Sequence, residues 1–107
     1  MIYFIFEIRI TDPQHTAEDY AAAWVAASRL IQRAPGALGT RLHRKIGDPR
    51  TLLAIASWES KAARDAMEGT AAEEIERIIA SQAPYVSIRV IGEFEAPAWE
   101  VLPLKLD

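Results

Sequence analysis

Three side chains in the middle of the chain have the types needed to bind and deprotonate an aromatic molecule. His43 exchanges a proton near neutral pH, which makes it the best candidate for a general base. Arg41 could hold a phenolate or carboxylate through its forked guanidinium group, and Trp58 could stack on a planar ring. Each residue also has a structural alternative: an exposed strand histidine, a surface salt bridge and a core side chain.

The placement of these residues depends on one predicted hairpin. The segment 47–50 reads Gly-Asp-Pro-Arg, which is typical of a turn. If this turn joins two strands directly, the numbers of paired residues add up to about 97. Arg41 and His43 then share a face with three residues of the next strand, Ala54, Ala56 and Trp58. Large polar groups beside alanines leave room for a small-molecule cavity, and a shift of one residue would move them to the opposite face.

Strands and helices can be predicted from period and capping residues. Thr16 and Asp19 form a capping box that begins a helix, and Pro35-Gly36 ends it. Trp24 lies on the apolar stripe of this helix, where it packs on the sheet or lines the cavity. Four segments rich in β-forming residues are predicted strands: 2–10, 38–46, 51–59 and 85–95.

The second helical region is predicted to be broken in two. Ser60 caps a short helix that runs through Met67, a further candidate for the cavity lining, and Gly69 breaks it. A second capping box at 70–73 begins the next helix. The order β-α-β-β-α-β predicts a ferredoxin-like α+β fold, in which helices cover one face of a four-stranded antiparallel sheet.

The third predicted strand is apolar on both faces. Leu52, Ala54 and Ala56 lie on one face, and Leu53 and Ile55 on the other. The sheet face away from the helices would normally be polar, so something must cover it. A second copy of the chain is the simplest cover, and we expect a homodimer with its sheets face to face. The apolar tail, residues 95–107, could act as an arm that reaches across the partner.

Composition excludes several classes of protein. The chain has 107 residues, with 12 Lys and Arg against 15 Asp and Glu, and it lacks the basic footprint of a nucleic-acid binder. No apolar run approaches the roughly 20 residues that span a bilayer. We therefore expect a single cytoplasmic domain over residues 1–107 that binds neither nucleic acid nor a membrane.

The sequence shows no pattern for a metal or a cofactor. Cysteine is absent, which excludes disulfides, thiolate nucleophiles and cysteine-based metal sites. The two histidines lie far apart and form no ligand motif, and there is no phosphate-binding glycine loop or dinucleotide fingerprint. We expect no metal site and no cofactor, so any oxygenation would use the electrons of the substrate.

The stretch from Ala34 to Met67 resembles the antibiotic biosynthesis monooxygenase (ABM) family. The resemblance is carried by Pro35-Gly36 before the second strand, Asp48-Pro49 in the hairpin, and Trp58-Glu59-Ser60 at the end of the third strand. It implies the dimeric α+β barrel fold and a pocket between the sheet and the helices. The family includes oxygenases and isomerases, so fold does not settle the reaction.

The chain departs from the two best-defined chemistries of this family. The haem-degrading members have an Asn on the first strand, a Trp after the third strand and a histidine ligand. The matching positions here are Glu7 or Ile8, Met67 and the vicinity of Arg77, which argues against haem degradation. The cofactor-free oxygenases are similar at Trp58 but place an Asn four residues earlier, where this chain has Ala54, and it contains no Asn at all.

Three hypotheses follow for the function. In the first, a cofactor-independent monooxygenase acts on an electron-rich phenol or hydroquinone: His43 deprotonates the substrate, Arg41 stabilises the anion and Trp58 lines the pocket. The second is a homodimer that binds a small aromatic molecule without catalysis, as a stress or pathway accessory protein. The third is an isomerase or lyase on the same fold, with His43 as the base and no use of oxygen.

Overall fold

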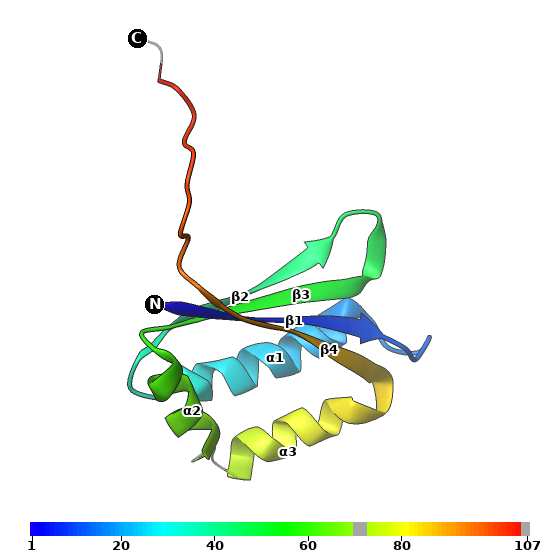
Figure 1. Ribbon diagram of the computed structural model, residues 1–107. Coiled ribbons are helices and arrows are strands. Elements are labelled where there is room, and N and C mark those ends of the chain that lie inside the picture. Colours follow the sequence, from blue (N-terminus) through cyan, green and yellow to red (C-terminus); the bar gives the residue numbers. More distant parts are fainter. Residues whose placement is uncertain (70–72, 106–107) are drawn as a thin grey trace.

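The computed structural model of the chain describes residues 1–69 and 73–105 (Figure 1). Its regular elements follow the predicted order, with the second helical region in two parts. They are β1 (Ile2–Ile10), α1 (Ala17–Ile31), β2 (Ala37–Lys45), β3 (Asp48–Trp58), α2 (Lys61–Gly69), α3 (Glu73–Gln82), the 3₁₀ turn η1 (Ala83–Tyr85) and β4 (Val86–Glu95). Among the described residues, no helix is long and apolar enough to cross a membrane.

The four strands form one antiparallel sheet in the order β2-β3-β1-β4, and the helices lie together on one of its faces (Figure 1). This arrangement is the predicted ferredoxin-like α+β fold. The two central strands are β1 and β3, so residues of these strands are flanked on both sides. Any cavity between the helices and the sheet must therefore be floored mainly by β1 and β3.

The helices begin where their capping residues predict. The Thr16 hydroxyl accepts a hydrogen bond from the Asp19 N–H, and the Asp19 carboxylate accepts one from the Thr16 N–H. The Ser60 hydroxyl accepts a hydrogen bond from the Ala63 N–H at 3.1 Å and fixes the start of α2. The predicted capping box at 70–73 begins outside the described residues.

The hairpin between β2 and β3 differs from the prediction. Its loop contains only Ile46 and Gly47, because Lys45 already pairs with Asp48. The Asp48 carboxylate then accepts hydrogen bonds from the Arg50 N–H and from the Thr51 hydroxyl, at 3.0 and 2.6 Å. Regular pairing resumes only after this irregularity. Pro49 has no N–H to donate, which favours such a bulge.

The bulge changes the register of the hairpin by one residue. Arg41 pairs with Ile55 and His43 with Leu53, whereas the prediction put them opposite Ala56 and Ala54. Because successive side chains alternate between faces, Arg41 and His43 lie on the sheet face away from the helices. The predicted grouping of these two residues with Ala54, Ala56 and Trp58 is therefore wrong.

The core lies between the sheet and the helices. Ile8, Ile10, Leu52 and Ala54 supply its strand side, and Tyr20 is the largest side chain that α1 buries there. Trp24 is partly buried against the same cluster, as its position on the helical stripe predicts. The helix-facing side of the sheet is thus a continuous apolar surface.

The opposite face of the sheet is open and carries an apolar strip among charged residues such as Glu7 and Arg41. Ile5 and Ile55 pair at its centre, with Leu53 beside them, and Phe94 pairs with Tyr3 toward β4. No element of the described chain covers this face, and the tail after β4 leaves the body of the protein (Figure 1). The large apolar residues of the tail are 71–96% exposed: Trp99, Val101, Leu102 and Leu104.

Gly36, in the turn between α1 and β2, lies close to the start of α2. Gly36 has a φ of +86°, and a Cβ atom there would lie 2.6 Å from the Cβ of Ala63. The Gly36 carbonyl also accepts a hydrogen bond from the Glu59 N–H at 2.8 Å. The turn before β2 is therefore packed directly against the first turn of α2.

We predict that Gly36→Ala lowers the free energy of unfolding by about 2–4 kcal/mol, since it adds a clash to the cost of a left-handed backbone. Gly47→Ala is the matched control, because Gly47 has a φ of +85° with nothing within 4 Å of its Cβ position. It should lose only about 1–2 kcal/mol. Urea denaturation measures both, and equal losses would contradict the close packing at Gly36.

Candidate ligand-binding cavity

A cavity of about 440 Å³ lies between the helix-covered face of the sheet and the three helices. Its wall is mostly hydrocarbon, contributed by β1, β3 and β4 below and by α1, α2 and α3 above. The aromatic part of the wall consists of Phe4, Phe6, Tyr20, Trp24 and Trp58. A cavity of this size and character matches the usual small-molecule site of proteins.

The shape of the floor follows from the mixture of residue sizes on β1 and β3. Phe4 and Phe6 of β1 stand in line with ring centroids 5.6 Å apart, and Ala56 of the paired strand β3 lies opposite Phe4. Trp58 is only 2% exposed and forms one end of the floor. The large rings on one strand and the small residue on the other leave open space above β3.

The structure brings together four of the five predicted lining residues. Trp58, Ala56, Trp24 and Met67 all contribute to the wall of this cavity. Ala54 is fully buried in the adjoining core cluster. These residues come from α1, α2 and β3, so only the tertiary fold assembles them.

The two predicted catalytic candidates lie elsewhere. Arg41 and His43 are exposed, and they border a more open hollow between α1 and β2, which Trp24 also lines. Neither contributes to the wall of the apolar cavity. The hairpin bulge thus separates the predicted base and anion-binding group from Trp58.

Sequence reasoning missed the charged group of the wall, Arg64 of α2. It is the only formally charged residue among the described lining residues. Its guanidinium carbon lies 3.8 Å from the centroid of the Phe4 ring, in the geometry of a cation–π contact. The side chain is 12% exposed, so the charge is largely withdrawn from water.

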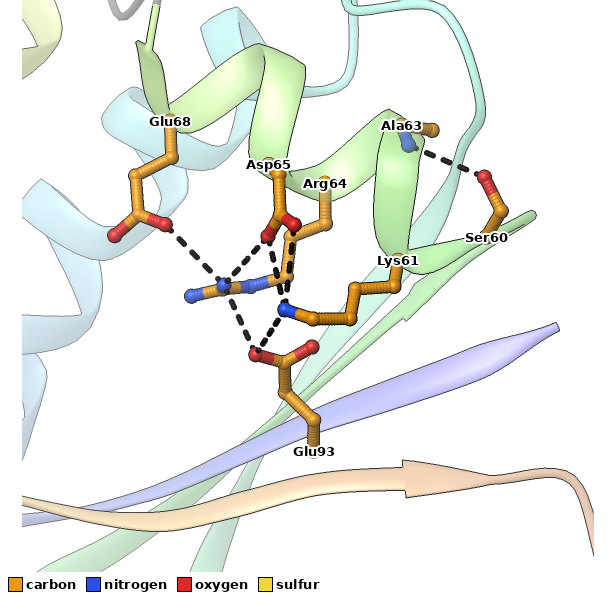
Figure 2. Close-up of polar contacts among 7 residues, drawn as sticks. All are labelled: Ser60, Lys61, Ala63, Arg64, Asp65, Glu68 and Glu93. Atoms are coloured by element: carbon orange, nitrogen blue, oxygen red, sulfur yellow. Dashed lines mark hydrogen bonds and ion pairs between the residues drawn. The ribbon is translucent and has the colours of Figure 1, made fainter.

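Acidic side chains surround this guanidinium group (Figure 2). Nη1 of Arg64 lies 3.3 Å from Glu68 Oε2 and 3.4 Å from Glu93 Oε1. Lys61 also reaches Glu93, at 3.5 Å, and Asp65, at 3.2 Å. Glu93 therefore links α2 to β4 and holds the helix over one end of the cavity.

The sequence signals for this cluster are the four-residue spacings of Arg64–Glu68 and of Lys61–Asp65. Residues four apart on a helix are neighbours, so an Arg64–Glu68 pair could have been expected. The contact with Glu93 depends on β4 lying beside β1, and the contact with Phe4 depends on the side of α2 that faces the sheet. Neither can be read from spacing.

Several polar side chains of the wall already have protein partners. The Gln32 carbonyl accepts a hydrogen bond from the Gly39 N–H at 2.8 Å, and Gln82 donates one to the Ser81 hydroxyl at 2.7 Å. The Thr40 hydroxyl donates to the Ile55 carbonyl at 3.4 Å. Burial raises the pKa of Tyr20 to about 12, so its phenol is neutral near pH 7.

The described lining contains no histidine, aspartate or glutamate. It therefore offers no ordinary general base to a bound molecule, while Arg64 offers positive charge. Within residues 1–69 and 73–105, no group of three or more His, Cys, Asp or Glu side chains could hold a metal ion. The arrangement is suited to binding a flat apolar molecule, and the positive charge of Arg64 beside it is shared with the carboxylates of Asp65, Glu68 and Glu93.

Comparisons with known proteins agree with this fold. The sequence model described as antibiotic biosynthesis monooxygenase matches residues 1–80. No curated protein matches the chain. Solved structures do match, and the three described next are 10–16% identical to this chain, which supports a common fold only.

The structure of SnoaB, a cofactor-independent oxygenase from Streptomyces nogalater, has a TM-score of 0.76 at 16% identity and covers 96% of this chain and 97% of its own. A conserved protein of unknown function from Bacteroides thetaiotaomicron has a TM-score of 0.72 at 10% identity, covering 89% and 96%. A structure described as an antibiotic biosynthesis monooxygenase has a TM-score of 0.64 at 16% identity, covering 91% and 100%.

Proposed function

The chain belongs to the antibiotic biosynthesis monooxygenase family, and from this premise we propose that it is a homodimer that binds an electron-rich phenol or hydroquinone and oxygenates it without a resident cofactor. The observation that carries the proposal is the cavity with its aromatic wall. A planar aromatic ring would stack on Trp58 or Trp24 and exclude water from the hydrocarbon wall. Ala56 and Met67 would complete its binding site.

The proposed reaction needs no electrons beyond those of the substrate. A phenol with an open para position and one O₂ give a quinone and one water: one oxygen atom forms the new carbonyl, and the other leaves as water. The phenol supplies all four electrons that reduce O₂. The likeness to SnoaB, a cofactor-independent oxygenase, supports this class of chemistry.

Arg64 is the residue we assign to charge stabilisation in this reaction. A phenol reacts with oxygen through its electron-rich anion, and its proton would pass to water because the described wall contains no base. Ala54 provides no amide to stabilise that anion. All three ion pairs of Arg64, with Asp65, Glu68 and Glu93, use Nη1. Its Nε and Nη2 groups have no hydrogen bond within the described residues, so they could donate to a phenolate oxygen.

The dimer is proposed from the open face of the sheet. Ile5, Leu53 and Ile55 are half-buried and form an apolar strip on this face. Two of these three residues, Leu53 and Ile55, belong to β3. A second sheet would cover the strip, and the exposed residues of the tail would add apolar contact area across the partner.

A second candidate, non-catalytic binding of the same class of molecule, is favoured by one observation. The described cavity wall contains no general base. This absence argues against the isomerase or lyase hypothesis, which requires a base, and is compatible with binding alone. A binding protein would need only the apolar wall and Arg64. Turnover therefore decides between these two functions.

The test uses 1-naphthol, followed with an oxygen electrode and by the appearance of 1,4-naphthoquinone. We expect the protein to consume one O₂ for each quinone formed, above the rate in buffer. Ala56→Phe should abolish this rate because the new ring fills the cavity floor, while Ala22→Phe on the exposed side of α1 should retain it. Binding of 1-naphthol without oxygen uptake would favour the second candidate, and no binding would overturn both.

A further inference from the structure

Tyr20 occupies the end of the cavity remote from Arg64. It lies in the second turn of α1, is 7% exposed, and packs in the cluster that contains Ile8 and Ile10. Arg64 instead lies over Phe4, four residues earlier on β1 than Ile8. At about 3.3 Å per residue, these two contact points on the strand are roughly 13 Å apart.

The phenol hydroxyl of Tyr20 has no hydrogen-bond partner in the described part of the chain. The fully enclosed unpaired atoms there are His15 Nδ1 and Gln82 Oε1, and the Tyr20 oxygen is not one of them. It is therefore accessible, and Tyr20 contributes to the cavity wall. Because the hydroxyl reaches the cavity and has no protein partner, it is free to form a hydrogen bond with a molecule bound there.

The surroundings of Tyr20 keep its phenol hydroxyl protonated, so that it can donate a hydrogen bond. Burial raises the pKa of Tyr20 to about 12, and the neighbouring Tyr85 phenol acts in the same direction. The hydroxyl therefore carries its proton at any pH near 7. Its natural counterpart on a ligand is an acceptor oxygen.

We infer that Tyr20 binds the ligand by donating a hydrogen bond to a phenolate, quinone or hydroxyl oxygen at the α1 end of the cavity. This inference rests on the proposed function, because it requires the cavity to hold the aromatic molecule. It adds that the ligand carries an oxygen at the end opposite Arg64. Tyr20 thus selects oxygenated rings over plain hydrocarbons of the same shape.

The experiment compares Tyr20→Phe with Tyr85→Phe. Tyr85 is equally buried, but it stacks on His15 at 3.9 Å and does not line the cavity. Two probes of one shape are used in equilibrium dialysis: 1,4-naphthoquinone, which has acceptor oxygens, and naphthalene, which has none. We expect Tyr20→Phe to weaken quinone binding about fivefold to tenfold and to leave naphthalene binding unchanged. Tyr85→Phe should leave the affinity for both probes unchanged.

The stability of the unliganded protein gives an independent measurement. Because the Tyr20 hydroxyl has no partner, Tyr20→Phe should leave the urea midpoint unchanged or raise it. A lower midpoint would mean that the fold itself uses the hydroxyl, which would overturn the inference. Unchanged quinone binding by Tyr20→Phe would also overturn it and leave the proposed function intact. Failure of the unaltered protein to bind either probe would overturn the proposed function, and the inference with it.

Discussion

Ile55→Glu should convert the proposed homodimer into a monomer of 11.9 kDa. Ile55 lies at the centre of the open sheet face, paired with Ile5 on β1 and with Arg41 on β2. In the single chain the new carboxylate is solvated and lies beside the Arg41 guanidinium group, so the fold should persist. In the dimer, symmetry would bury two such carboxylates between the sheets. We expect the dissociation constant to rise by at least about a thousandfold.

Ile46→Glu is the matched control for this substitution. Ile46 is 99% exposed at the tip of the hairpin, so the same change of residue type occurs away from the sheet face. Sedimentation velocity at micromolar concentration should show a dimer for the control and a monomer for Ile55→Glu. Circular dichroism of both variants should remain that of the folded chain. A dimeric Ile55→Glu protein would mean that the sheets do not meet face to face.

Trp58→Ala should lower the free energy of unfolding by about 3–5 kcal/mol and abolish binding of aromatic probes. The indole is 2% exposed at the end of β3, where it pairs with Ile2 on one side and Ala37 on the other. Its removal opens a void in the core and deletes a flat surface of the cavity at the same time. For a chain of this size, the thermal midpoint should fall by more than about 10 °C.

Trp99→Ala controls for the loss of an indole as such. Trp99 is 91% exposed in the tail and contributes nothing to the core of its own chain. We would introduce Trp99→Ala into the monomeric Ile55→Glu variant and compare both at the same protein concentration. The free energy of unfolding should change by less than about 0.5 kcal/mol. Binding of 1-naphthol by Trp58→Phe separates the two roles of Trp58, because phenylalanine keeps most of the burial. Full binding by Trp58→Ala would show that the ligand does not contact this wall.

Local sequence signals predicted the elements of this fold well. The Thr16–Asp19 capping box and the Ser60 cap each act within a few residues, and each lies where a helix begins. Helix α1 ends at Ile31, four residues before the predicted stop at Pro35-Gly36. Trp58, Ala56, Trp24 and Met67 could be proposed for one cavity because the family resemblance supplied the pocket's place in the fold.

The strand register and the charged part of the cavity could not be predicted in this way. The register of β2 and β3 depends on whether a bulge forms at Asp48, and this bulge is stabilised by the hydrogen bonds of Asp48 with Arg50 and Thr51. One residue of difference moved His43 and Arg41 to the opposite face. Arg64 meets Glu93 and Phe4 only through the packing of α2 on the sheet. Contacts of this kind arise from tertiary structure, which no local pattern encodes.

The extended tail has a consequence for how the sequence can change in evolution. Its large apolar residues pack on nothing in their own chain, so substitutions among Trp99, Val101, Leu102 and Leu104 leave the monomer fold intact. Their hydrophobic free energy is available only to contacts with another molecule. In the proposed dimer, substitutions in this segment would therefore change the strength of self-association without altering the fold of the chain. Core and cavity positions such as Trp58 and Tyr20 lack that freedom, because each substitution there alters folding or binding at once.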